Sequence, residues 1–200
     1  MNLSGKMSGR CGFTLIEMLI VLTMLAIVIT VGAPSFSGFV KEGRVKSGAH
    51  ALAVAIQTAR IKSISANRRC YLDFAPGALT PADSFYTFWL DMDGDLSYDA
   101  GEIDSTNLAL PDTKSGFRGF KLPKGVAFSN YAAATSTGPG GGAIPSGGVD
   151  FTNDQASFNS RGEGTAGSVY LLGENSSFYA ITVSSLGAVR TWRWEDNTWK

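Results

Sequence analysis

Residues 13–33 read Phe-Thr-Leu-Ile-Glu-Met-Leu-Ile-Val-Leu-Thr-Met-Leu-Ala-Ile-Val-Ile-Thr-Val-Gly-Ala and contain a single charged side chain, that of Glu17. A helix of this length spans about 30 Å, the thickness of the hydrocarbon core of a bilayer. The basic residues Lys6 and Arg10 precede the run, so the positive-inside rule leaves the N-terminus in the cytoplasm. The sequence therefore predicts a single-pass membrane helix at residues 13–34, followed by an external domain.

The carboxylate of Glu17 is out of place in such a helix, because a charge there costs about 2.5–3.5 kcal/mol on insertion scales. An ionisable residue inside a membrane is by default functional and needs a partner. Cleavage after Gly12 would create one, the α-amino group of Phe13, which could pair with Glu17 of a neighbouring subunit. A secretory signal peptide has a shorter apolar run of about 7–15 residues. A plain membrane anchor does not explain Glu17.

The hexapeptide Gly-Phe-Thr-Leu-Ile-Glu at residues 12–17 resembles the prepilin-peptidase site of type IV pilins and type II secretion pseudopilins. The resemblance implies that residues 1–12 are a leader, that prepilin peptidase cuts after Gly12 and methylates Phe13, and that Glu17 guides subunit docking. Pro34 matches a proline that the family often has where the helix leaves the membrane. The implied location is the bacterial inner membrane, with one pass, the head in the periplasm and final assembly into a filament.

Beyond Pro34, apolar and small residues continue to recur at helical spacing. They are Phe36, Phe39, Val40, Val45, Ala49, Leu52, Ala53, Ile56, Ala59 and Ile64. We expect Pro34 to kink the helix rather than end it. One helix should then run from residue 13 to about residue 66. Its first half suits a bilayer or the core of a filament, and its amphipathic second half, residues 35–67, needs a sheet to pack against.

The period of the apolar pattern changes to two after residue 67, which predicts a β-rich head over residues 68–200. The predicted strands are residues 69–74, 85–91, 126–129, 149–151, 156–159, 168–172, 178–184 and 188–194. The Gly-rich stretch at residues 135–148 predicts a flexible loop or hairpin tip. The predicted fold class is α+β, with a long N-terminal helix packed on an antiparallel sheet as in pilins.

Further matches resemble the GspH/FimT group of minor pseudopilins and minor pilins. Ala-Arg-Ile-Lys-Ser-Ile-Ser-Ala-Asn at residues 59–67 is similar to the end of the group's long helix. Trp-Leu-Asp-Met-Asp-Gly at residues 89–94, followed by Gly101 and Glu102, resembles its strand and acidic loop. Residues 158–162 and 183–190 resemble its two late strands with glycine turns. The implied partners are prepilin peptidase, other pilin or pseudopilin subunits and the inner membrane.

The acidic stretch at residues 91–102 has oxygen-bearing side chains at loop positions 1, 3, 5, 9 and 12, the spacing of a twelve-residue calcium loop. The candidate ligands are Asp91, Asp93, Asp95, Asp99 and Glu102. Leu96 occupies position 6, where the sharp turn of such a loop favours glycine. The alternative is a solvated acidic turn. Calcium is the one cofactor that the sequence suggests.

Catalytic chemistry has little support in this sequence, so we expect a structural protein and not an enzyme. His50 is the only histidine, and we expect it to lie at the interface between helix and head. No Gly-x-Ser-x-Gly or Walker motif occurs. Cys11 falls in the predicted leader, which leaves Cys70 without a disulfide partner and points to a core position for it.

The C-terminal stretch mixes tryptophans with Arg190 and Arg193, a combination that can stack bases and hold phosphates. Some FimT-like minor pilins bind DNA through an arginine pair after a glycine, but here only Arg190 aligns. The 17 basic and 17 acidic residues balance, which gives no argument for steering of nucleic acid. A minor pseudopilin or pilin is the favoured interpretation, serving protein secretion or pilus biogenesis. A DNA-uptake minor pilin, a major pilin, which would usually carry a C-terminal cysteine pair, and an uncleaved single-span protein remain as alternatives.

Overall fold

The computed structural model describes residues 12–75, 84–96, 120–129 and 137–200. By its internal contacts the chain divides into two compact units, Met1–Phe39 and Val40–Lys200, and each is considered by itself. The predicted ligands Asp99 and Glu102 lie outside the described residues, as does the leader before Gly12.

The 52-residue helix α1 (Leu15–Ala66) passes through Pro34, as expected. It ends at Asn67, which adopts a positive φ of 52° and donates its N–H to the carbonyl of Ile64. The next N–H, that of Arg68, is donated to the carbonyl of Ser63. This pair of bonds around a left-handed residue is a Schellman motif, with asparagine in the place that glycine usually takes.

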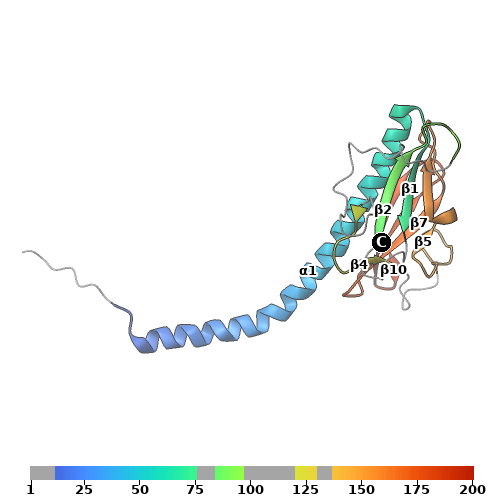
Figure 1. The fold of residues 1–200 in the computed structure, drawn as a ribbon. Helices are drawn as coiled ribbons and strands as arrows, with labels where there is room; N and C mark the ends of the chain where they lie inside the picture. The colour runs from blue at the N-terminus through green and yellow to red at the C-terminus, as the bar shows by residue number, and fades with distance from the viewer. Residues whose placement is uncertain (1–11, 76–83, 97–119, 130–136) are drawn as a thin grey trace, which may run out of the picture. The chain divides into compact units, whose positions relative to one another are not determined.

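The described strands form two antiparallel sheets (Figure 1). They are β1 (Cys70–Ala75), β2 (Phe85–Leu90), β3 (Phe120–Lys121), β4 (Val126–Phe128), β5 (Val149–Asp150), β6 (Gln155–Phe158), β7 (Gly167–Gly173), β8 (Phe178–Val183), β9 (Val189–Glu195) and β10 (Thr198–Trp199). The first sheet has the order β3-β2-β1-β6. The second has the order β10-β9-β8-β7-β4, and β5 also pairs with β7. The α+β class and the antiparallel pairing are confirmed.

The strands divide into two sheets because the outer edge of β6 is already occupied. The segment after β6 folds back on it, with a bridge between Phe158 and Gly164 and a bond of 2.9 Å from the Thr165 N–H to the Ser157 carbonyl. A short 3-10 helix, η1 (Thr152–Asp154), carries the chain from β5 in one sheet to β6 in the other. The larger hydrophobic core of the described residues then lies between both sheets and the second half of α1.

The second half of α1 supplies one buried stripe to this core. Its core residues follow the three- and four-residue spacing of an amphipathic helix and are Val45, Ala49, Leu52, Ala53, Ile56 and Ala59. Phe39 and Ile64, which the sequence placed on the same stripe, are instead 74% and 48% exposed. His50 is also exposed, so the predicted interface position is wrong. Cys70 is fully buried, as predicted.

A smaller apolar cluster covers the outer face of the second sheet. Tyr170, Phe178 and Ala180 form its centre, and Trp192, Trp194 and Trp199 pack against them. The predicted loop at residues 135–148 is described from Thr137 onward and forms a hairpin tip, with a bridge between Thr137 and Ala143. The indole N–H of Trp199 donates to the carbonyl of Thr137 at 3.2 Å, which ties this hairpin to the C-terminal strand.

Candidate functional site

The predicted cleavage site lies directly before α1. Gly12 and Phe13 are exposed, and Phe13 exposes 76% of its surface. A side chain added at Gly12 would meet no described atom within 4 Å. The fold of the described residues therefore places no steric demand on Gly12, and a need for glycine there would come from whatever binds this segment.

Thr14 and Glu17 close the N-terminus of α1 by a reciprocal pair of hydrogen bonds. The Glu17 N–H donates to Thr14 Oγ1 at 3.2 Å, and the Thr14 N–H donates to Glu17 Oε2 at 3.4 Å. This arrangement is a capping box, in which two otherwise unpaired backbone donors are satisfied by side chains. The spacing Thr-x-x-Glu at residues 14–17 is the local signal that predicts this cap, in addition to the charge of Glu17.

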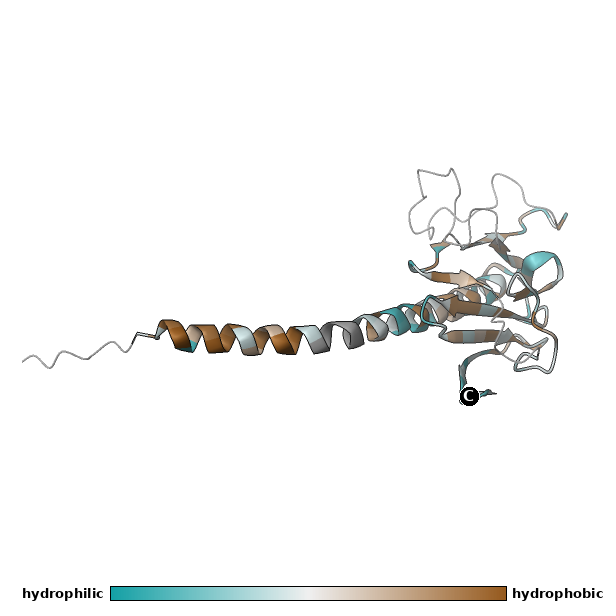
Figure 2. Cartoon of the chain, turned by 90° about the horizontal axis from the view of Figure 1, so that it is seen from below, coloured by the Kyte–Doolittle hydropathy of each residue, from teal (hydrophilic) through white to brown (hydrophobic). Residues whose placement is uncertain are grey.

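The first half of α1 is largely hydrophobic (Figure 2). Its large apolar side chains are exposed within a single chain. Leu15, Leu22 and Val28 expose 83%, 63% and 68% of their surfaces. The hydroxyls of Thr23 and Thr30 donate to the carbonyls of Ile20 and Ala26, each at 2.8 Å, so the helix satisfies these polar groups by itself. Of the helices in the described part of the chain, none has the length and hydropathy required to cross a membrane. The span at residues 13–34 therefore stays a prediction.

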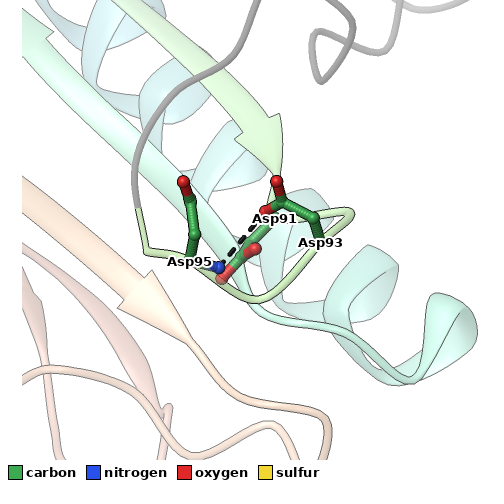
Figure 3. Close-up of side chains that lie close together, drawn as sticks. All are labelled: Asp91, Asp93 and Asp95. Atoms are coloured by element: carbon green, nitrogen blue, oxygen red, sulfur yellow. Dashed lines mark hydrogen bonds between the residues drawn. The ribbon is translucent and has the colours of Figure 1, made fainter.

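Three of the five predicted calcium ligands come together after β2 (Figure 3). Carboxylate oxygens of Asp91, Asp93 and Asp95 all lie within 4.8 Å of one another. Asp91 is buried and accepts the Gly94 N–H at 2.6 Å, whereas Asp93 and Asp95 are exposed. Leu96 adopts a positive φ of 65°. The left-handed turn that a calcium loop makes with glycine therefore forms here with leucine.

The two C-terminal arginines have different surroundings. Arg193 Nη2 lies 2.5 Å from Glu42 Oε1, and Arg193 Nη1 lies 3.8 Å from Glu195 Oε1. Burial raises the pKa of the neighbouring Tyr179, and the Arg193 charge opposes that shift. Arg190 is exposed and makes no ion pair with another described residue. The two arginines therefore differ in their electrostatic surroundings, and the predicted contact with DNA through them stays a prediction.

Arg60 joins the segments that carried the family resemblance. Its Nε donates to the Gly162 carbonyl at 2.9 Å and its Nη2 donates to the Leu186 carbonyl at 3.3 Å. Gly187 has a φ of +74°, and a Cβ there would lie 2.1 Å from the Gly162 carbonyl oxygen. The end of α1 and the two glycine turns thus meet at one point. No local pattern could have indicated this, because the two bonds join residues 102 and 126 positions apart.

A long N-terminal helix with an exposed apolar first half, packed by its second half on antiparallel sheets, defines a pilin-like subunit. The chain belongs to the GspH family, since the family model described as type II transport protein GspH matches residues 48–187. A second model, the prokaryotic N-terminal methylation motif, matches residues 7–33.

Two solved structures align with most of the chain at low identity. The minor pseudopilin EpsH from the type 2 secretion system of Vibrio cholerae has 13% identity and a TM-score of 0.45, and the alignment covers 74% of this chain and 95% of EpsH. The type IV minor pilin FimU of Pseudomonas aeruginosa has 12% identity and a TM-score of 0.43, with coverage of 76% and 90%. A search of curated proteins finds no match.

Proposed function

We propose that this chain is a minor subunit of a type II secretion pseudopilus or a type IV pilus. It is made as a precursor in the inner membrane, cut after Gly12 and methylated at Phe13, and it enters the filament through the first half of α1. The observation that carries the proposal is the match of residues 7–33 to the N-terminal methylation motif, followed by a helix whose apolar side chains no part of the described chain covers. Its role is structural, in support of protein secretion or pilus biogenesis.

Processing can be tested by mass spectrometry of the full chain produced with and without a prepilin peptidase. The expected product begins at N-methylated Phe13. Gly12→Val should block cleavage, while Gly38→Ala serves as the matched control, because neither site has a described atom within 4 Å of an added Cβ. Recovery of an intact Met1 in assembled filaments would contradict the proposal.

Glu17 has two tasks under this proposal. In the precursor it caps α1 through the Thr14 N–H. After cleavage its charge pairs with the α-amino group of Phe13 in a neighbouring subunit, where both charges leave water together. The cap needs an acceptor, which glutamine also supplies, but the ion pair needs a carboxylate.

The two tasks can be separated by a pair of variants measured for incorporation into filaments. Glu17→Gln keeps the cap and removes the charge, so we expect normal membrane insertion and strongly reduced incorporation. Thr14→Ala removes one bond of the cap and keeps the charge, so incorporation should fall much less. Equal incorporation of Glu17→Gln and the unmodified chain would rule out the ion pair.

We also propose that the loop after β2 binds Ca²⁺. What supports this is the approach of the Asp91, Asp93 and Asp95 carboxylates to within 4.8 Å and the left-handed conformation of Leu96 at the turn position. Asp99 and Glu102 would complete the oxygen set. Because leucine at a positive φ is strained, the affinity should fall in the weak range of extracellular sites, about 10⁻⁴–10⁻³ M.

Thermal unfolding of the full chain in detergent, with calcium and with chelator, tests this site. At a calcium concentration of about 100 times the dissociation constant, binding to the folded state adds about 2.7 kcal/mol. Leu96→Gly should increase the shift in melting temperature, since glycine removes the strain, and Asp93→Asn should reduce it. Magnesium at equal concentration is the control ligand. If the melting temperature is the same with calcium and with chelator, the loop is a solvated acidic turn.

A further inference from the structure

Among the described residues, part of one edge of β9 carries no neighbouring strand. On one side β9 pairs with β8 from Val189 to Arg193. On the other side β10 pairs only with Trp194 and Glu195. Beyond these pairs, Arg193 and Lys200 exchange two backbone bonds of 2.8 and 2.9 Å. From Val189 to Trp192, no strand among the described residues lies on this side of β9.

The direction of the main-chain groups along this edge follows from antiparallel geometry. In such a ladder the N–H and C=O groups of alternate residues point to opposite sides. The main-chain N–H and C=O groups of Arg193 point away from β8, because they bond with Lys200. Thr191 and Val189 therefore also point away from β8. Their two N–H groups and two carbonyls have no hydrogen-bond partner in the described part of the chain. An open edge of this kind is a template for another strand.

The charges beside this edge are positive and incompletely neutralised. Arg193 is paired with Glu42 and Glu195, but Arg190 is exposed and has no described ion pair. A strand that adds to this edge thus meets the Arg190 guanidinium, which has no ion pair in the described part of the chain.

The sheet itself offers no carboxylate close to Arg190. Arg190 is directly opposite Thr182, Thr182 is opposite Ser168, and Ser168 is opposite Asp150, so these residues form one row across the sheet. The Thr182 hydroxyl already accepts the indole N–H of Trp192 at 3.0 Å. Asp150 lies three strand spacings from Arg190, about 14 Å. At that backbone separation Asp150 is not a direct neighbour of Arg190, so a carboxylate placed directly opposite Arg190 would come from a strand on the open side.

We propose that the edge of β9 from Val189 to Trp192 is a docking site for an extended acidic segment of another protein chain, which joins the second sheet as an added strand. Two of its residues exchange backbone bonds with Val189 and Thr191. The residue between them carries a carboxylate opposite Arg190 and extends the polar row of the sheet. This is strand addition, in which backbone bonds supply affinity and alternate side chains supply specificity.

A second copy of this chain fits the edge less well. The symmetric antiparallel register that satisfies both free residues pairs Val189 with Thr191 of the other copy. That register places the two Arg190 side chains directly opposite each other, where like charges destabilise a sheet. The partner is therefore a different chain, and the site is independent of whether residues 1–12 are removed.

The experiment tethers an acidic strand to the edge so that the effective concentration is high. The full chain, in detergent, is extended after Lys200 by Thr-Val-Glu-Val. By the register of β10, the third added residue lies opposite Arg190. Hydrogen exchange of the Val189 and Thr191 amides should slow by about tenfold relative to the unextended chain. The matched extension Thr-Val-Lys-Val should protect them much less.

Two variants separate the contribution of the backbone hydrogen bonds of this edge from that of the Arg190 charge. Thr191→Pro removes only an outward N–H, a position where an edge strand accepts proline, and should abolish protection of Val189 by the extension. Arg190→Glu leaves the backbone intact and should reverse the preference, so that the lysine extension protects more than the glutamate one. This second variant keeps the test decisive if the proline variant does not fold.

Two results would overturn the proposal. One is unchanged exchange of both amides with either extension, which would show that the edge does not accept a strand. The other is protection of the unextended chain by duplex DNA that falls with salt and with Arg190→Ala but is insensitive to Thr191→Pro. That outcome would assign Arg190 to nucleic acid.

Discussion

The two halves of α1 belong to one continuous helix but have opposite surroundings. Leu52 in the second half is fully buried in the head, whereas Leu22 in the first half exposes 63% of its surface. The buried residues of the second half form a stripe, while the exposed apolar residues of the first half occur at nearly every position from Leu15 to Ile29 and so lie on every side of the helix. The head thus covers this stripe of apolar side chains in the second half. The apolar side chains of the first half are exposed in the described part of the chain, which is typical of a helix that packs against lipid or other subunits.

Leucine-to-alanine changes should give the largest difference between the two halves in the free energy of unfolding of the head. Leu52→Ala removes a fully buried side chain from the main core and should destabilise the head by about 2–5 kcal/mol. The matched control Leu22→Ala should change the same free energy by less than about 0.5 kcal/mol. Urea unfolding of the full chain in detergent, followed by the fluorescence of the buried Trp89, measures both. Similar losses for the two variants would contradict the division of α1.

Glycine substitutions sharpen the same contrast. Gly187→Ala places a methyl group 2.1 Å from the Gly162 carbonyl oxygen on a backbone with φ of +74°, and should cost about 2–3 kcal/mol. Gly38→Ala, in the N-terminal unit, meets no described atom within 4 Å and should stabilise the helix by up to about 1 kcal/mol. The same urea titration shows whether the signs differ. Destabilisation by both substitutions would mean that Gly38 is packed in the folded chain.

The sequence predicted the elements of the head well, because their patterns are local. Each of the eight predicted strands is confirmed to within one residue at both ends, and α1 ends at Ala66 as expected. Strands β3 and β10, of two residues each, were missed. The separation into two sheets was also missed, because it depends on β1 pairing with β6, more than 80 positions away in the sequence.

The candidate sites also divide into those formed by residues close in the sequence and those formed by residues far apart in it. The Thr14–Glu17 cap and the approach of Asp91 to Asp95 are short-range, and their spacing is legible in the sequence. The contact of Arg60 with two glycine turns and the neutralisation of Arg193 by Glu42 join distant segments. Contacts of this kind produce no periodic pattern in the sequence. The open edge of β9 could not be predicted from the sequence for the same reason.

Alkaline pH should destabilise the head and leave the first half of α1 unaffected. Burial raises the pKa of Tyr86 from 10.0 to about 12. Between these values the unfolded chain releases a proton that the folded chain keeps, so stability present below pH 10 is lost as the pH rises to 12. The loss from this residue is about 2.7 kcal/mol. Tyr86→Phe should remove that part of the slope in urea titrations at pH 9–12, and the N-terminal unit contains no tyrosine. An identical slope in the variant would contradict the assignment.

The smallest effect concerns the first turn of α1, whose side chains from Leu15 to Met18 are exposed. Thr14→Ala removes the acceptor of the Glu17 N–H and should destabilise the first turn by about 1 kcal/mol. Thr23→Ala is the matched control, because its hydroxyl bonds only to a carbonyl of its own helix and alanine is a better helix former. Hydrogen exchange at Ile16, Glu17 and Met18 should quicken in the first variant alone, while the unfolding of the head stays unchanged in both. Equal exchange in the two variants would mean that the cap adds nothing to the helix, and that the conformation of Glu17 is free to be set by its partner.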